Sequence, residues 1–244
     1  MKKTLLAVLL GSFALASFAQ PITIEKQGAF SAGGTVIEAK KTFDPYHPEP
    51  DAMTLHGDHA NVIYQIPAHA KNVSLMFLHG AGQSMRTWQT TPDGREGFQS
   101  VFLRKGYPVY LIDQPRRGDA GRATVDGTIK ASPDEQFWFG QFRMGLWPKF
   151  YDNSAFASQK DLNSFWRQMT PNTAPYNDKV IADAVTDALQ KTEGTVLVTH
   201  SQGCGPGWLI GTEAGKNLKG IIAFEPGSGF IFPEGKVPAP IPNN

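Results

Sequence analysis

Apolar residues in this chain form short runs that alternate with segments of helical periodicity. Four runs are almost continuously apolar, as in strands covered on both faces of a parallel sheet, at residues 73–80, 107–113, 195–201 and 220–226. The earlier segments 30–39 and 61–67 have β-branched and alternating strand character. Apolar positions recur at helical spacing over 94–105, and a further helix is expected over 177–190. Alternation of strand and helix predicts βαβ units, so we expect an α/β fold with a mostly parallel sheet flanked by helices.

The long interval 123–176 interrupts this alternation with many aromatic residues. They are Phe137, Trp138, Phe139, Phe142, Trp147, Phe150, Tyr151, Phe156, Phe165 and Trp166. The interval is either a small packed subdomain without contact to substrate or a cap that lines an apolar pocket over the active site. We favour a cap insertion, because the interval follows the strand that ends at Asp113, above the carboxyl edge of the sheet.

The first residues have the pattern of an export signal. Lys2 and Lys3 precede an apolar run over residues 5–15, and small residues follow as far as Ala19. This pattern predicts a signal peptide, residues 1–19, that is cleaved after Ala19, and the run is shorter than the roughly 20 residues of a membrane anchor. We therefore expect an exported protein, periplasmic or secreted, without a stable membrane anchor. Residues 20–244 are expected to form one domain.

Charge and short motifs exclude several classes of function. The formal net charge is +1, so the chain lacks the basic field that a nucleic-acid partner requires. Cys204 is the only cysteine, which leaves no intrachain disulfide. The sequence contains no C-x-x-C, no H-E-x-x-H and no G-x-G-x-x-G that opens a helix after the first strand. We expect no metal and no cofactor, and a redox or metal enzyme has little support.

A candidate nucleophile follows the third of the four apolar runs. Residues 196–207 read V-L-V-T-H-S-Q-G-C-G-P-G, so a strand ends at Ser201 and a glycine-rich helix start follows. This arrangement is typical of a nucleophile elbow, G-x-S-x-G, in which the serine lies at the tip of a sharp turn. Thr199 replaces the first glycine, a tolerable departure, and Gly203 provides the second. The alternative is a serine that caps an ordinary helix.

Acyl transfer also requires two backbone N–H groups directed at the developing oxyanion. One follows the nucleophile, and the other belongs to the loop after an earlier strand. The N–H groups of Gln202 and Ala81 match these positions, the second in the segment His79-Gly80-Ala81-Gly82. We expect His79 to shape this turn by hydrogen bonding rather than to act as a base.

Five motifs together carry a resemblance to a known family. They are H-G (79–80), W-x-T-T-P-D-G-R-E-G (88–97), V-Y-L-I-D-Q (109–114) with Arg117-Gly118, T-H-S-Q-G (199–203) and A-F-E-P-G (223–227). In this combination the chain resembles the α/β-hydrolase superfamily from about Thr42 onward, and within it a group of secreted bacterial esterases. The resemblance implies an ester hydrolase that forms an acyl-enzyme on Ser201. It also implies a Ser-His-acid triad whose acid ends the strand after the nucleophile's helix.

Glu225 matches the position that the resemblance implies for the acid. Physical reasoning points to the same residue, because a carboxylate at the end of the strand 220–224 would lie beside the nucleophile strand and could orient an imidazole. A solvated or capping glutamate is the alternative. Asp113 is expected to brace loops together with Arg116 or Arg117.

The histidine of such a triad is missing from the given sequence. Triad residues follow the order nucleophile, acid, histidine in this fold, yet none of the six histidines follows Ser201. We therefore expect a C-terminally incomplete hydrolase whose histidine lies beyond Asn244. Its substrate is expected to be a small, uncharged, partly apolar ester. The alternative from another class is a non-catalytic exported binding protein that uses the capped pocket.

Overall fold

The structure, a computed structural model, describes residues 21–156 and 158–227. The predicted signal peptide and its cleavage site after Ala19 lie outside the described residues, so both stay predictions. In the part of the chain that is described, no helix has the length and the apolar character needed to cross a membrane.

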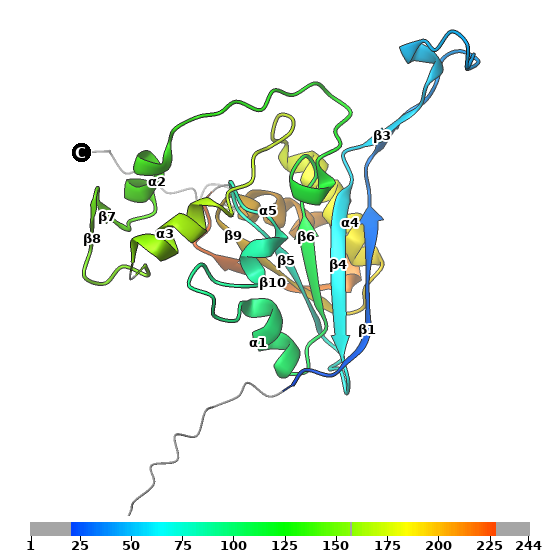
Figure 1. The fold of residues 1–244 in the computed structure, drawn as a ribbon. Coiled ribbons are helices and arrows are strands. Elements are labelled where there is room, and N and C mark those ends of the chain that lie inside the picture. Colours follow the sequence, from blue (N-terminus) through cyan, green and yellow to red (C-terminus); the bar gives the residue numbers. More distant parts are fainter. Residues whose placement is uncertain (1–20, 157, 228–244) are drawn as a thin grey trace, which may run out of the picture.

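A six-stranded sheet forms the centre of the molecule (Figure 1). In order across the sheet, the strands are β1 (Ile24–Ala32), β4 (Ala60–Pro67), β6 (Val109–Asp113), β5 (Ser74–Leu78), β9 (Thr195–His200) and β10 (Leu218–Phe224). Strands β6, β5, β9 and β10 are parallel, which confirms the prediction for the four continuously apolar runs. Strands β1 and β4 extend the sheet with antiparallel pairs.

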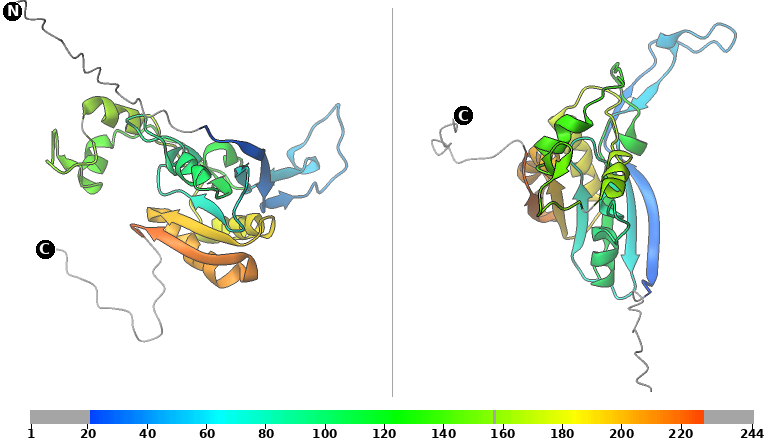
Figure 2. Two further views of the ribbon diagram at one scale, coloured as in Figure 1. Left: turned by 90° about the horizontal axis from the view of Figure 1, so that it is seen from below. Right: turned by 60° about the vertical axis from the view of Figure 1, so that its left-hand side comes forward.

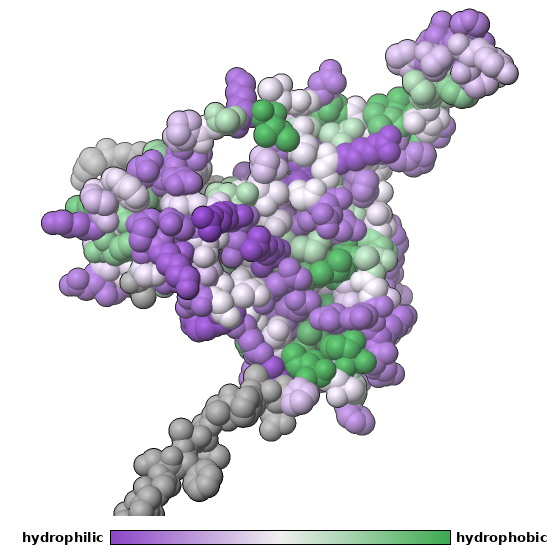
Figure 3. Space-filling model, viewed as in Figure 1, coloured by the Kyte–Doolittle hydropathy of each residue, from purple (hydrophilic) through white to green (hydrophobic). Residues whose placement is uncertain are grey.

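Helices cover both faces of this sheet. They are α1 (Phe98–Arg104), α4 (Asp178–Gln190) and α5 (Cys204–Glu213). Alternate residues of β5 belong to different core clusters: Met76 and Leu78 lie in one with side chains of α4 and α5, whereas Leu75 and Phe77 lie in the other with Leu103 of α1. Successive side chains of a strand point to opposite faces, so burial of both faces explains a continuous apolar run. On the face in Figure 3, polar residues predominate and apolar ones form separate patches.

The structure corrects two predicted boundaries. The predicted strand 30–39 is wrong as a single element, because Gly33 and Gly34 adopt φ values of +62° and +100° and end β1. The chain continues as β2 (Thr35–Ile37), which pairs with β3 (Leu55–Gly57) in a hairpin that projects from the body (Figure 1). The predicted helix 94–105 begins only at Phe98, after a turn in which Gly94 has φ +88°. Both differences arise where glycine adopts a conformation that other residues avoid.

The interval 123–176 forms a small unit of its own beside the sheet (Figure 2). Its elements are α2 (Glu135–Gln141), β7 (Gly145–Leu146), β8 (Lys149–Phe150) and α3 (Gln159–Trp166). Phe139, Met144, Leu162 and Trp166 are buried in a separate core cluster. This packing explains part of the aromatic content of the interval, whereas Phe137, Phe142, Trp147 and Tyr151 are exposed. Thr170 N, beyond α3, donates to Gly82 O at 2.8 Å, so the unit contacts the loop that follows β5.

Candidate active site

Ser201 lies at a sharp turn between β9 and the short 3-10 helix η4 (Ser201–Gly203), which leads into α5. Its φ angle is +52°. A serine in the left-handed region is uncommon, and such conformations gather at sites where the backbone must present a side chain. The local geometry is that of the elbow that the sequence predicts.

Two glycines allow the helix to pass close to the strands behind it. A Cβ atom on Gly203 would lie 2.5 Å from the carbonyl oxygen of His79, and one on Gly207 would lie 2.9 Å from Cγ2 of Thr199. Gly207 thus leaves the space that the threonine methyl group occupies, while Oγ1 of Thr199 contacts Sγ of Cys204 at 3.1 Å. The structure therefore accommodates threonine in place of glycine at position 199 because residue 207, which faces it, is a glycine.

The two predicted oxyanion donors, Ala81 and Gln202, line the same cavity of about 770 Å³. The loop that carries Ala81 lies against the elbow, because a Cβ atom on Gly80 would lie 2.9 Å from Cβ of Ser201. Ser201 itself is not among the residues that line this cavity, although its neighbour Gln202 is. The structure therefore brings the donor loop, the elbow and the cavity rim together.

Glu225 follows β10 at the carboxyl edge of the sheet, beside the elbow. Phe224 is paired with His200 in the parallel register, so the next residues, Glu225 and Ser201, lie at the ends of adjacent strands. The Glu225 side chain is 74% exposed, and each of its carboxylate oxygens lies 3.4 Å from Nη2 of Arg143 in the cap interval. Among the described residues it makes no hydrogen bond to a histidine. Burial lowers the pKa of His200, and the charge of Glu225 opposes this shift to a smaller extent.

His79 is completely buried and serves the turn, in agreement with the sequence-based expectation. Its Nδ1 donates to the carbonyl of Gly80 at 3.1 Å, and its Nε2 accepts from the backbone N–H of Gln114 at 3.4 Å. A carbonyl can only accept and an N–H can only donate, so these partners define the neutral Nδ1–H tautomer. Burial and, to a smaller extent, the charge of Arg117 lower the pKa of His79 to about 3.

None of the histidines in this chain contacts the Ser201 hydroxyl in the part that the structure describes. His200, the sequence neighbour, directs Nδ1 to Oε1 of Gln83 at 3.0 Å. His79 is occupied by Gly80 and Gln114. Within the same described residues, no group of three or more His, Cys, Asp or Glu side chains could hold a metal ion.

A family model for the alpha/beta hydrolase family matches residues 75–243, which is more than half of the chain. The chain belongs to the alpha/beta hydrolase family. A curated relative, "Probable secreted lipase phiG" from a fungal species, is 32% identical over 161 residues, which are 62% of this chain and 44% of the lipase. A solved structure described as a novel bacterial esterase is 29% identical with a TM-score of 0.73, and the match covers 86% of this chain and 71% of that one. This hydrolase chain thus spans less than half the length of the lipase.

Asp113 braces loops in this hydrolase, as expected, but it does so without a hydrogen bond to Arg116 or Arg117, of which only Arg117 acts on it through its charge. Its carboxylate accepts from the backbone N–H groups of Met85 at 2.6 Å and Asp119 at 2.8 Å, so it braces two loops through their amides. Arg116 instead forms a buried ion pair with Asp58 at 2.8 Å. Burial raises the pKa of Asp113, and the two amides oppose that rise.

Sequence reasoning gave no role to Gln83 and only a loop-bracing role to Arg117. Gln83 Oε1 accepts from the N–H of Gly80 at 2.8 Å, and Arg117 Nη1 donates to the carbonyl of Gly80 at 2.7 Å. The one signal in the hydrolase sequence was an arginine, Arg117, in the loop four residues after the buried strand β6. Its partners lie far away along the chain, so only the fold reveals them.

Proposed function

We propose that this chain is a carboxylic ester hydrolase that forms an acyl-enzyme on Ser201. The observation that carries the proposal is the φ angle of +52° at Ser201, where β9 turns into α5. Membership in the alpha/beta hydrolase family supports the reaction class, and so do the names of the fungal lipase and the bacterial esterase. The strained turn lifts the serine side chain to the carboxyl edge of the sheet, where such folds bind their ligands.

In the proposed mechanism, Oγ of Ser201 attacks the ester carbonyl while a histidine accepts its proton. The N–H groups of Ala81 and Gln202 donate to the oxyanion of the tetrahedral intermediate. The histidine then gives its proton to the leaving alcohol, and water releases the acid from Ser201 by the reverse sequence. Glu225 orients the histidine and stabilises its cationic form, as its position next to the elbow permits.

The base in this proposal is an imidazole other than those of His79 and His200. The contacts of His79 and His200 support this assignment, because both rings are turned toward other partners. A histidine that binds Glu225 would compete with Arg143 for the exposed carboxylate. Because the Glu225 carboxylate is largely exposed and, among the described residues, binds only Arg143 at 3.4 Å, we expect the imidazole to bind this carboxylate.

The proposed substrate is a small, uncharged, partly apolar ester. The cavity beside Ala81 and Gln202 has a volume of about 770 Å³, which lies within the range of small-molecule sites. Three aromatic side chains of the cap interval line it: Trp138, Phe142 and Trp166. The aromatic side chains favour an apolar acyl or alcohol group, and Lys130, Asp134 and Glu135 line the same cavity, which agrees with a substrate that is only partly apolar. The lining supports the role of the interval as a cap.

Export to the periplasm or the medium is part of the same proposal. The N-terminal pattern of charge, apolar run and small residues supports it. The printed name of the fungal relative, a secreted lipase, agrees with this location.

The experiment uses the product of the full-length gene, treated with a fluorophosphonate probe and assayed with a short aryl ester. Ser201→Ala should abolish labelling and reduce kcat by a factor on the order of 10⁶. Ser164→Ala is the matched control, because its hydroxyl donates to the Lys160 carbonyl within α3, away from the elbow. Retained hydrolysis in Ser201→Ala would exclude the assignment.

A binding protein is the second candidate, favoured because no histidine hydrogen-bonds to the Ser201 hydroxyl among the described residues. It predicts that the full-length protein binds aryl esters without hydrolysis and without labelling. Labelling at Ser201 would exclude it.

A further inference from the structure

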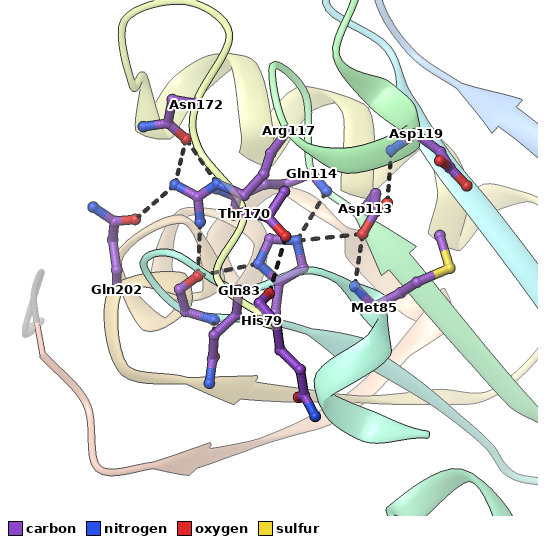
Figure 4. A network of polar contacts seen from close by, with 12 residues as sticks. His79, Gln83, Met85, Asp113, Gln114, Arg117, Asp119, Thr170, Asn172 and Gln202 are labelled. Atoms are coloured by element: carbon purple, nitrogen blue, oxygen red, sulfur yellow. Dashed lines mark hydrogen bonds and ion pairs between the residues drawn. The ribbon is translucent and has the colours of Figure 1, made fainter. Parts of the chain in front are cut away.

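Arg117 joins three parts of the site through a single buried guanidinium group (Figure 4). The residue is 2% exposed and follows β6. Its Nη1 donates to the carbonyl of Gly80 at 2.7 Å, and Nη2 donates to Oε1 of Gln202 at 3.5 Å. Nε and Nη2 both donate to Oδ1 of Asn172, which lies beyond α3 near the end of the cap interval. The donor loop, the elbow and the cap interval therefore meet at one side chain.

The carbonyl of Gly80 belongs to the same peptide group as the N–H of Ala81. In a planar trans peptide the C=O and N–H bonds point in opposite directions. A donor that holds the Gly80 oxygen therefore also sets the direction of the Ala81 N–H. At 2.7 Å to a cation, this hydrogen bond is of the short, charge-assisted kind. It also polarises the peptide group, which makes the N–H a stronger donor.

Other contacts keep the same loop from turning. His79 Nδ1 donates to the Gly80 oxygen from a second direction at 3.1 Å. Gln83 Oε1 accepts from the Gly80 N–H at 2.8 Å, so the peptide groups on both sides of Gly80 are anchored. Donors that are fixed before reaction lose no free energy to reorganisation when the oxyanion forms.

We propose that Arg117 is a positioning residue that directs and polarises the Ala81 N–H for the oxyanion, and that Asn172 holds its guanidinium in place. This inference rests on the proposed function, because it assigns Ala81 to the oxyanion hole. Because Asn172 holds Arg117, the orientation of the Ala81 N–H also depends on the segment around Asn172, near the end of the cap interval. Disturbing this segment should lower the rate of the chemical step without contact to the reacting atoms.

Direct binding of an anionic substrate by Arg117 is the competing role, since the residue also lines the cavity. A guanidinium has five N–H donors. Four of them serve Gly80, Asn172 and Gln202, which leaves a single donor for any ligand. Burial lowers the pKa of Arg117 to about 10, so the group remains a cation at neutral pH. A carboxylate would need two adjacent guanidinium N–H donors, and the protein already uses all but one of the N–H donors of Arg117.

The test compares an aryl ester with its thionoester in the full-length enzyme. Charge develops on sulfur in the thionoester, and sulfur is a weak hydrogen-bond acceptor, so an intact oxyanion hole favours the ester selectively. Arg117→Met should lower kcat for the ester by about 10- to 100-fold with little change in KM, and should lower the ester-to-thionoester ratio similarly. Asn172→Ala should lower the ratio less. A ratio equal to that of the parent in folded Arg117→Met would overturn the proposal.

Arg116→Met is the matched control. Its guanidinium binds Asp58 and the carbonyl of Pro175 and makes no contact with Gly80. The substitution should lower the urea midpoint, yet the ester-to-thionoester ratio should stay at the parent value. An equal fall of the ratio in both arginine variants would assign the effect to general destabilisation and exclude the positioning role.

A second measurement does not depend on catalysis. In Ser201→Ala protein labelled with ¹⁵N-alanine, Arg117→Met should move the Ala81 amide resonance upfield in ¹⁵N, because the cation no longer polarises the Gly80 carbonyl. Arg116→Met should leave this resonance in place, and an unchanged resonance in Arg117→Met would contradict the proposal. Hydrolysis by Ser201→Ala would refute only the proposed function. The Ala81 resonance would still test whether Arg117 polarises this peptide group.

Discussion

Acidification should destabilise this protein through His79. Burial and, less strongly, the charge of Arg117 lower the pKa of the folded-state imidazole from 6.5 to about 3. Between pH 6.5 and pH 3, His79 is therefore protonated in the unfolded chain but stays neutral in the folded protein. Because the unfolded state binds more protons in this window, the free energy of unfolding falls as pH falls, by up to about 1.4 kcal/mol per pH unit. For His79 alone, the expected loss between pH 7.5 and pH 5 is about 2 kcal/mol.

Urea unfolding at pH 7.5 and pH 5 measures this loss in the parent and in His79→Asn. The amide nitrogen of asparagine can replace Nδ1 as the donor to the Gly80 carbonyl, whereas asparagine has no group that titrates. The variant should be less stable at both pH values because a buried ring is lost, yet its stability should fall by about 2 kcal/mol less than that of the parent. All other titrating groups are present in both proteins, including Asp113, whose Oδ1 lies 3.8 Å from Nε2 of His79, so the difference reports on the His79 site.

His69→Asn is the control for this experiment. His69 is exposed and has φ +57°, a conformation that asparagine tolerates. It should keep the pH dependence of the parent. An equal loss of stability in the parent and in His79→Asn would show that the folded protein protonates His79 near the ordinary pH, and would refute the reasoning from burial.

Two further predictions concern carboxylates. Glu225→Gln should lower kcat of the full-length enzyme by roughly 10²–10⁴ with little change in KM, measured by steady-state kinetics. Asp113→Asn should mainly lower stability in urea titrations, by about 1–3 kcal/mol, because its amide would face a backbone N–H. Exchange of these two outcomes would make Asp113 the acid. The pKa of Asp58 is lowered to about 2, chiefly by Arg116, so the ionised Asp58 should add stability above pH 4 that is lost as pH falls toward 2. In urea titrations, Asp58→Asn should remove this loss at acid pH and should lower stability at pH 7 by about 3 kcal/mol, because Arg116 is left unpaired.

The elements whose information is local were predictable from the sequence. Continuous apolar runs predicted the parallel strands β5, β6, β9 and β10, because burial on both faces leaves no polar position. The start of α4 follows from Asn177, whose side chain accepts from the N–H of Val180 as a helix cap. The turn at Ser201 was readable because strand, serine and glycines are adjacent in the chain. The split of residues 30–39 into β1 and β2 was missed, since a glycine pair can continue a strand or end it.

The order of the strands and the contacts of the site were decided by the tertiary structure. The partners of Arg117 are 37, 55 and 85 residues away, at Gly80, Asn172 and Gln202. No local pattern distinguishes it from Arg116, which turns to Asp58 instead. Which of two adjacent arginines faces the elbow depends on how the loop after β6 packs between the sheet and the cap interval. A sequence specifies which groups can donate and accept, whereas only the packed fold decides which of them meet, because each contact depends on the positions of several distant segments at once.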